Sequence, residues 1–298
     1  MVAILISAIS QGLLWAILAI GIHITYRILD ISDLTSEGSF TLGAAVCASA
    51  IVNNIPPIIA VFMAIIAGSL AGMITGLLHT KLQIPSLLAG ILSMTGLYSI
   101  NLRIMGKANI PLNMSDTLLT NIKDLLNLGK DRDAAIILGI VVCIIVIILL
   151  VWFFNTEFGY AIVATGNNDK MIRANGINSD ITKIAGLMLA NALIALSGAL
   201  VCQYNGYADV QQGIGAIVIG LASVIIGEVI FRNRNLVMSL SGIVLGSIIY
   251  RLIVAIVINS NYVSANDMKL FTAIIVAIAL YVANVDLKKK RRLKHVDD

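Results

Sequence analysis

Between Asn155 and Lys183 the chain reads NTEFGYAIVATGNNDKMIRANGINSDITK, one of the few long polar segments in a sequence that is otherwise mostly apolar. The runs on either side of it, 134–154 and 184–202, contain no charged residue. About 20 such residues are long enough to cross the hydrocarbon core of a bilayer as a helix. The polar segment therefore joins two membrane-spanning helices at one face of a membrane.

The composition of the whole chain supports this interpretation. Of its 298 residues 59% are hydrophobic and only 12% are charged, whereas a soluble domain has about 25% charged residues. Backbone groups in lipid must be paired internally, so the spans are helices or a closed barrel. Because the apolar runs are continuous and do not alternate, the sequence predicts an all-α integral membrane protein, a polytopic helical bundle.

Nine apolar segments are expected to form the spans, with eight or ten as alternatives. The second is short enough to be a re-entrant or broken helix, and the seventh contains Glu228, which is expected to pair with Arg232 at i+4. Gly68, Gly72 and Gly76 are four residues apart, a spacing that lets helices approach closely. The segments are 3–26, 38–53, 57–79, 85–105, 134–154, 182–204, 213–230, 236–258 and 268–285.

The distribution of basic residues predicts the orientation. Short loops on the cytoplasmic side of membrane proteins are enriched in Lys and Arg. In this chain, Lys and Arg are more frequent on the side that contains the basic tail 288–298 and segment 155–183. We therefore expect both to be cytoplasmic and the N-terminus to be outside. On the outer side, 115–128 has helical apolar spacing with Ser115 as N-cap, and it either caps the bundle or docks an extracellular protein.

Signatures of catalysis are absent from the sequence. The Gly-Lys pairs at Gly106 and Gly129 lack the residues of a phosphate-binding loop, and the three histidines are scattered. The three cysteines lie within apolar runs and fit no metal or disulfide spacing. We expect no enzyme activity, no catalytic residue, no metal and no cofactor in this chain, and no nucleic acid as a partner.

Polar residues in or beside the spans are the candidates for lining a translocation path, because such groups at membrane depth usually face a cavity or a partner. The alternative for the stretch that starts at Asp33 is a plain cytoplasmic loop, and Arg251 is expected to reach the membrane interface. The candidates are Asp33, Thr35, Glu37, Gly38, Ser39, Asn191 and Gln203, with Gly38 and Gly43 expected to give flexibility.

Two stretches resemble a known family. RILDISDLTSEGSFTLGAAV (27–46) is similar to the signature after the first span in permeases of the branched-chain amino acid type of ABC importer. EFGYAIVATGNNDKMIRANGIN (157–178) resembles the cytoplasmic coupling loop of that family, although Ile162-Val163-Ala164 stands where an Arg is usual. The wording DLTSEGSFTLGA is similar to that of the tryptophan/tyrosine-type uptake permeases.

The resemblance implies a type II ABC importer-like permease in the bacterial cytoplasmic membrane. Residues 1–287 would form one transmembrane permease domain that works as a dimer. Its partners would be a second identical copy, cytoplasmic ATPase subunits that bind ATP, and an extracellular or periplasmic substrate-binding protein. The solute would be an aromatic or branched-chain-like amino acid. Contacts to the ATPase would come from Gly166, Asn167, Asn168, Asp169, Lys170, Arg173, Ala174 and Gly176.

Three alternatives remain open on the residues. One is an ion- or proton-coupled secondary carrier. The spans lack the pairs of buried carboxylates expected of a proton relay, which argues against this alternative. Another is a sugar or nucleoside permease of the same ABC family. The third is a structural membrane subunit without a transport path.

Overall fold

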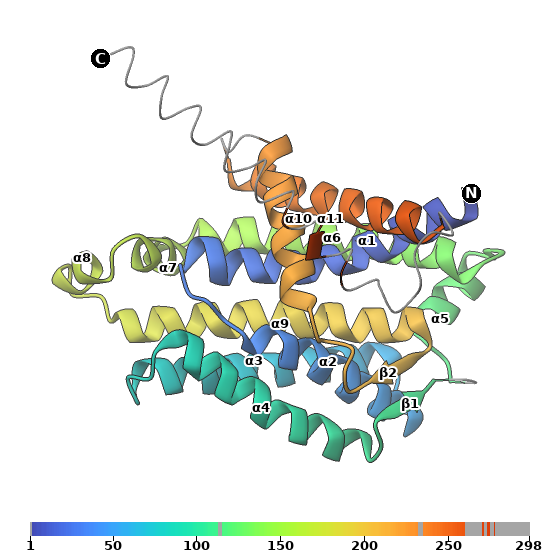
Figure 1. The fold of residues 1–298 in the computed structure, drawn as a ribbon, viewed down its shortest axis with the longest axis horizontal. Helices are drawn as coiled ribbons and strands as arrows, with labels where there is room; N and C mark the ends of the chain where they lie inside the picture. The colour runs from blue at the N-terminus through green and yellow to red at the C-terminus, as the bar shows by residue number, and fades with distance from the viewer. Residues whose placement is uncertain are drawn as a thin grey trace, which may run out of the picture.

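The computed structural model describes residues 2–112, 115–231 and 235–259, together with a few isolated residues after 259. Within these ranges the chain is almost entirely helical (Figure 1). The helices are α1 Val2–His23, continued by the π-helix η1 Ile24–Ile28, α2 Thr35–Val52, α3 Pro57–Thr80, α4 Ser86–Met105, α5 Leu118–Leu125, α6 Asp131–Phe154, α7 Glu157–Asn167, α8 Asp169–Ala174, α9 Ser179–Asn205, α10 Ala216–Ile230 and α11 Leu236–Asn259.

Helix boundaries follow local sequence signals. Pro57 occupies the first turn of α3, where its missing N–H costs nothing and its fixed φ suits a helix. Gly106 and Gly206 end α4 and α9 in the left-handed conformation, at φ of 66° and 75°. These signals explain why the helix ends lie within a few residues of the expected segment boundaries.

The expected count of nine spans is not confirmed. Six helices in the described ranges are long and apolar enough to cross a membrane, namely α1 with η1, α3, α4, α6, α9 and α11. The second and seventh expected spans form α2 and α10, which are not among the six, because α10 has only 15 residues and α2 is less apolar. The ninth, 268–285, lies almost wholly outside the described residues.

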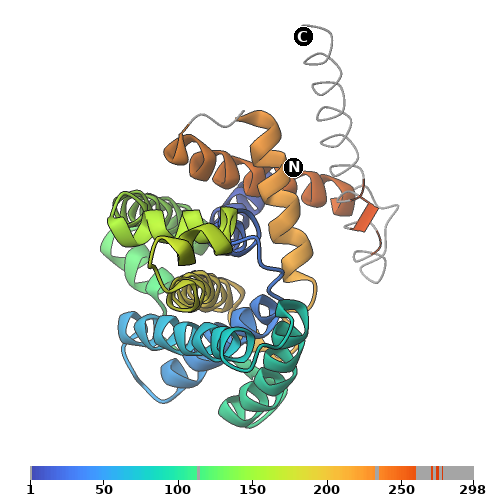
Figure 2. The ribbon, with the colours of Figure 1, turned by 90° about the vertical axis from the view of Figure 1, so that its left-hand side faces the viewer.

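Helices α2 and α10 differ from the rest in their course. The chain after η1 runs back into the bundle, and α2 begins there and not at the end of the bundle (Figure 1). Helix α10 is steeply inclined to the long helices in both views (Figures 1 and 2). Both helices therefore have their N-termini inside the molecule, next to each other.

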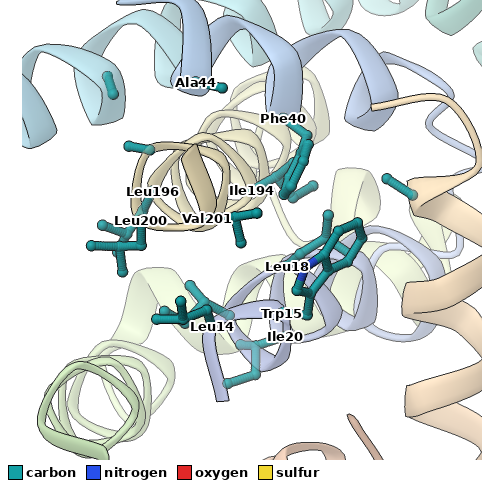
Figure 3. Close-up of a cluster of buried hydrophobic side chains, with 14 of the residues drawn as sticks. Leu14, Trp15, Leu18, Ile20, Phe40, Ala44, Ile194, Leu196, Leu200 and Val201 are labelled. Atoms are coloured by element: carbon teal, nitrogen blue, oxygen red, sulfur yellow. The ribbon is translucent and has the colours of Figure 1, made fainter. Parts of the chain in front are cut away.

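Helices α1 and α9 form the centre of the bundle and are its most buried long helices (Figure 2). Between α1, α2 and α9 lies a cluster of large apolar side chains, in which the rings of Trp15 and Phe40 are 4.9 Å apart (Figure 3). Leu14 and Leu18 from α1 and Leu200 from α9 belong to the same cluster. Burial of these side chains fixes α1 and α2 against α9.

Glycines bring α3 and α9 into backbone contact, as their spacing predicted. A methyl group at Gly72 would collide with the carbonyl oxygen of Leu187, and one at Gly68 would meet the carbonyl oxygen of Asn191. Gly227 and Gly242 pair in the same way between α10 and α11. Small residues thus set the helix spacing at two separate interfaces.

A two-stranded antiparallel sheet was not predicted. Strand β1 (Asn109–Pro111) pairs with β2 (Tyr207–Asp209), and Ile110 lies opposite Ala208, both buried. The sheet ties the chain after α4 to the chain after α9 at the end of the bundle that carries α5 (Figure 1). Helix α5 begins at Leu118 with Thr117 as its N-cap, not Ser115.

Candidate functional site: the α7–α8 segment and the start of α2

Segment 155–183 folds into two short helices between α6 and α9. The side chain of Thr156 accepts a hydrogen bond from the N–H of Gly159 and caps α7. The side chain of Asn168 accepts one from the N–H of Met171 and caps α8. Because Asn168 is extended at φ −159°, the chain turns between the two helices. Gly176, at φ 80°, follows the end of α8 and lets the chain turn toward α9.

Buried contacts attach this segment to the bundle. The hydroxyls of Thr165 in α7 and Thr182 in α9 are 2.7 Å apart and buried. Gly166 lies so close to the chain after α1 that a methyl group there would collide with the carbonyl oxygen of Ile28. Ile172 is 5% exposed and holds α8 against the protein. The segment is therefore a packed part of the molecule.

Four ion pairs lie at α8, and two of them join it to α9. Asp169 accepts from Lys183 Nζ at 2.9 Å and from Arg173 Nε at 3.3 Å. Asp180 at the start of α9 accepts from Arg173 Nη2 at 2.7 Å and from Lys81 Nζ at 3.3 Å. The network joins α8, α9 and the α3–α4 connection, and networks of this kind hold geometry better than isolated surface pairs.

The charge of Asp169 is stabilised by this network. Burial alone would raise the pKa of the carboxyl group, but hydrogen bonds, including those from Lys183 and Arg173, outweigh it and lower the pKa to about 2. Asp169 is therefore ionised at any pH at which a cell lives, and the ion pairs persist.

A small polar cavity adjoins the network. Its volume is about 280 Å³, and its walls are His79, Thr80, Gln83, Arg173, Asp180 and Lys183. The Nδ1 atom of His79 lies 2.9 Å from the carbonyl oxygen of Ile84, which fixes the ring beside the α3–α4 connection. The cavity is a feature of the same end of the bundle.

The outward side of the segment carries a different set of residues. Lys170 and Met171 are exposed on α8, and Lys170 takes part in none of the ion pairs found in the described ranges. Asn167, Asn168, Ala174 and Gly176 are exposed as well, whereas Gly166 is half-buried and Ile172 is buried against the bundle. Arg173 is exposed but committed to two carboxylates.

The start of α2 is a second polar site, inside the bundle. Asp33 is 7% exposed and accepts from the side-chain amide of Asn191 at 2.8 Å and from the N–H of Thr35 at 2.9 Å. Asn191 lies near the middle of α9 and is fully buried. The Thr35 hydroxyl continues the chain of contacts to Thr75 in α3 at 2.8 Å, and Thr75 donates to Ser93 in α4 at 2.7 Å.

Glu37 points from α2 toward α10. One of its carboxylate oxygens accepts from the N–H of Gly215 at 2.9 Å, just before the first residue of α10. Thr41, one turn further along α2, accepts from the N–H of Gly213 at 3.0 Å. A carboxylate at this place also suits the positive end of the α10 dipole. The loop before α10 is thereby fixed on the first two turns of α2.

The chain between η1 and α2 is buried on one side and exposed on the other. Leu29, Ile31 and Asp33 are buried, whereas Asp30 and Ser32 between them are exposed. Asp30 is in the left-handed conformation, at φ 55°, so the chain turns at this residue. The side chains of Asp30 and Ser32 thus form a polar, accessible side of this segment.

Other predicted path residues lie elsewhere. Gln203 is near the opposite end of α9, where its Oε1 accepts from the N–H of Leu118 at 2.8 Å and fastens α5 to the bundle. Gly38 and Gly43 lie within the continuous helix α2 and pack against Leu97 and Ala195. Close packing of α2 against its neighbours accounts for both glycines, and the flexibility expected there stays a prediction. Ser39 is fully buried in α2.

Two predicted interactions of charged residues are also corrected. Glu228 pairs with Arg27, through contacts of 2.7 and 3.0 Å, while Arg232 lies outside the described residues. The Arg251 guanidinium lies over the Trp15 ring at 4.2 Å and donates to Gln11 at 3.3 Å, so it faces α1. Thr75, Ser93, Lys81 and Asp180 were missed, because no local pattern marks a partner distant in sequence.

Comparisons with known proteins agree on the kind of protein. Residues 4–280 match the sequence model of the family described as branched-chain amino acid transport system / permease component. The chain is 42% identical to the tyrosine transport system permease protein of Clostridioides difficile, over 96% of this chain and 94% of that protein. It is 25% identical to a ribose import permease protein of Haemophilus influenzae, over 71% of this chain and 64% of that protein.

A solved structure has the same fold. PsaBC from Streptococcus pneumoniae in complex with Fab superposes on this chain with a TM-score of 0.52, at 16% sequence identity, over 93% of this chain and 89% of that chain. At this identity the likeness concerns the arrangement of the helices alone.

Proposed function

The chain belongs to the family of permease components of branched-chain amino acid transport systems, a multi-pass protein family of the bacterial cytoplasmic membrane, and from this premise we propose that it forms the solute path of an ATP-driven importer for an aromatic amino acid. The observation that carries the substrate class is the 42% identity, over nearly the whole chain, to a tyrosine transport system permease. Tyrosine is the first solute to test.

The α7–α8 segment is the proposed contact with the ATPase. Its inner side is anchored to α9 by two ion pairs and by the buried Ile172, and its outer side presents Lys170 and Met171. A short element held this firmly moves as a rigid body when a partner pulls on it. ATP is bound by the partner, since the sequence has no phosphate-binding loop.

The start of α2 is the proposed lining of the solute path. Asp33, Thr35 and Asn191 form its buried side, and the exposed Asp30 and Ser32 border the accessible side. Carboxylates and hydroxyls at membrane depth suit a solute that carries an ammonium and polar groups. Gln203 is better assigned to holding α5.

Helix α5 and the sheet at the other end are the proposed docking surface for the binding protein. Gln203 fastens α5 to α9, and the pairing of β1 with β2 joins the chain after α4 to the chain after α9. The second permease of the complex is proposed to be an identical copy in the same membrane. Exposed apolar side chains of α10 and α11, such as Val218 and Leu245, are available to a second copy or to lipid.

The proposal is tested by purifying the tagged permease from its own membrane and identifying what remains bound. An ATPase subunit present at about one per permease chain is expected. The complex, with its binding protein, is then placed in liposomes loaded with ATP, and uptake of tyrosine, leucine and ribose is compared. Tyrosine uptake that requires ATP supports the proposal. Uptake of ribose but not of tyrosine contradicts it, and would agree with the 25% identity to a ribose import permease. Uptake of tyrosine without ATP also contradicts it.

A further inference from the structure

Residues 24–34, which we name the connecting segment, lie between α1 and α2 and touch three functional parts of the molecule. The segment begins with the wide turn of η1, in which Leu29 N–H donates to the carbonyl of Ile24 at 3.0 Å, and the next bond runs from Ile31 to Thr25 at 2.9 Å. π-turns of this kind are rare in proteins, and those that occur are often found at functional sites.

At its first end the connecting segment lies directly against α7. A methyl group at Gly166 would collide with the carbonyl oxygen of Ile28, so no side chain separates the two backbones. Gly186 of α9 leaves room for the Leu29 side chain, which would lie 2.6 Å from a methyl group there. A displacement of α7 toward the bundle therefore has to displace Ile28 and Leu29 as well, since close-packed groups transmit displacement.

One residue before this contact, the connecting segment is joined to α10. Arg27 Nε and Nη2 donate to the two carboxylate oxygens of Glu228 at 2.7 and 3.0 Å, a two-point contact that fixes orientation as well as distance. Glu228 lies in the last turn of α10. The other end of α10 is held by Glu37 and Thr41 of α2.

At its second end the connecting segment positions the start of α2. Asp33 is held by Asn191 and accepts a hydrogen bond from the N–H of Thr35, the first residue of α2. The N–H of Leu34 faces Gly90 of α4, where a methyl group would come within 2.7 Å of it. The same short piece of chain thus contacts α7, the last turn of α10 and the first turn of α2.

We propose that the connecting segment carries the movement of the α7–α8 segment to the start of α2, and that Arg27 and Glu228 are positioning residues that make α10 move with it. This inference rests on the proposed function, because it assigns a role in ATP-driven transport. Neither side chain needs to touch the solute. Their loss disconnects ATP hydrolysis from movement of solute without stopping hydrolysis.

The first test is the ratio of tyrosine taken up to ATP hydrolysed by the complete reconstituted complex. Glu228→Gln is expected to lower the ratio about fivefold, within the range over which single residues modulate coupling. Exchange of the charges, Arg27→Glu with Glu228→Arg, is expected to restore it. Asp133→Asn, which removes the ion pair of 3.8 Å between Arg132 and Asp133 in the first turn of α6 at the opposite end, is the matched control and leaves the ratio unchanged. An unchanged ratio in Glu228→Gln, or no recovery on charge exchange, overturns the inference.

The second test needs no substrate and separates failure of this inference from failure of the proposed function. Ser32 is exposed on the connecting segment, and the native cysteines are buried. The reaction of a Ser32→Cys variant with a soluble maleimide is measured with and without ATP and vanadate. The rate is expected to differ between the two states, and the difference is expected to vanish when Glu228→Gln is added. An equal difference in both backgrounds overturns the inference, even if tyrosine proves not to be the solute.

Discussion

One amide group of Asn191 serves two partners. Its Nδ2 atom donates to Asp33 at 2.8 Å and to the carbonyl of Leu187 at 3.0 Å, and the side chain is fully buried. Gly68 and Gly72 of α3 lie beside the same residue and close the space around it. A side chain so enclosed holds the buried carboxylate in one place.

Asn191→Ala is expected to destabilise the protein by about 1 to 3 kcal/mol, the usual cost of leaving a buried polar group without its hydrogen-bond partner. The cause is the loss of a donor to Asp33, where water has little access. Thermal unfolding of the purified permease measures the change. Asn53→Ala, which removes an exposed amide that donates to the carbonyl of Ser49, is the control. Equal loss of Tm in both variants would show that the Asp33 contact contributes nothing.

Gly72→Ala is expected to destabilise α3 against α9 by about 1 to 3 kcal/mol, because the added methyl group meets backbone that cannot move aside. Gly96→Ala in α4 is the matched control, since nothing lies within 4 Å of its new methyl group. That variant is expected to be neutral or slightly stabilising, as Ala favours a helix over Gly. Thermal stability in detergent distinguishes the two, and similar values for both would refute close packing as the role of Gly72.

At the scale of elements, α8 has one side committed to the protein and one side available. Arg173 bridges Asp169 and Asp180, so replacing it with an acid would place three carboxylates together and disrupt the segment itself. Lys170 is outside this network. The two basic residues are therefore not equivalent, although they are only three positions apart.

Lys170→Glu is expected to reduce transport driven by ATP about tenfold, which corresponds to the loss of a charged contact at a partner surface, while leaving permease stability unchanged. Lys130→Glu, at an exposed position near α5, is the control and should leave ATP hydrolysis and uptake unchanged if only the α8 side contacts the ATPase. Normal uptake in Lys170→Glu would remove this residue from the contact.

The pH dependence of α8 follows from Asp169. Because its folded pKa, about 2, lies below the ordinary value of 3.8, its ion pairs stabilise the fold above pH 3.8 and the contribution is lost as pH falls toward 2. Asp169→Asn removes this contribution at every pH. The Tm of the unaltered protein should therefore exceed that of the variant at pH 6, and the difference should shrink between pH 4 and 2. A difference independent of pH would contradict the assignment.

At the scale of the whole molecule, the two ends of the bundle are unlike. One end carries α7 and α8 with their ion pairs, and the other carries α5 and the small sheet (Figure 1). Helix α1 starts at the second end. An importer needs such a difference, because its ATPase and its binding protein act from opposite sides of the membrane.

Two cysteine substitutions, tested one at a time, check this orientation. Asn121→Cys on α5 is expected to react with a membrane-impermeant maleimide on intact cells, whereas Lys170→Cys on α8 is expected to react only after the cells are opened. Both positions are exposed, and the native cysteines are buried, so background labelling is low. Labelling of Lys170→Cys on intact cells would reverse the orientation predicted from the basic residues.

The sequence was sufficient to locate the helices but not to determine how far each crosses the membrane. Long apolar runs and residues such as Pro57 and Gly106 specify local structure. The two ends of α10 are held by Glu37 and Arg27. These residues are separated from their partners, Gly215 and Glu228, by 178 and 201 positions in the sequence. For the same reason the sequence could propose Asp33 and Asn191 as path residues but could not predict the hydrogen bond between them. The position of Gln203 beside α5 could not be predicted from the sequence either.

The wide turn of η1 contains one more residue than an α-helical turn. If Ile24–Ile28 tightened to the usual i to i+4 pattern, the residue released would lengthen the chain leading to α2. An extended residue spans about 3.3 Å, against 1.5 Å along a helix. Conversion of this π-turn to an α-helical turn would thus lengthen the connection between α1 and α2 by a few ångströms, and the reverse conversion would shorten it. Neither change requires the axis of α1 to move.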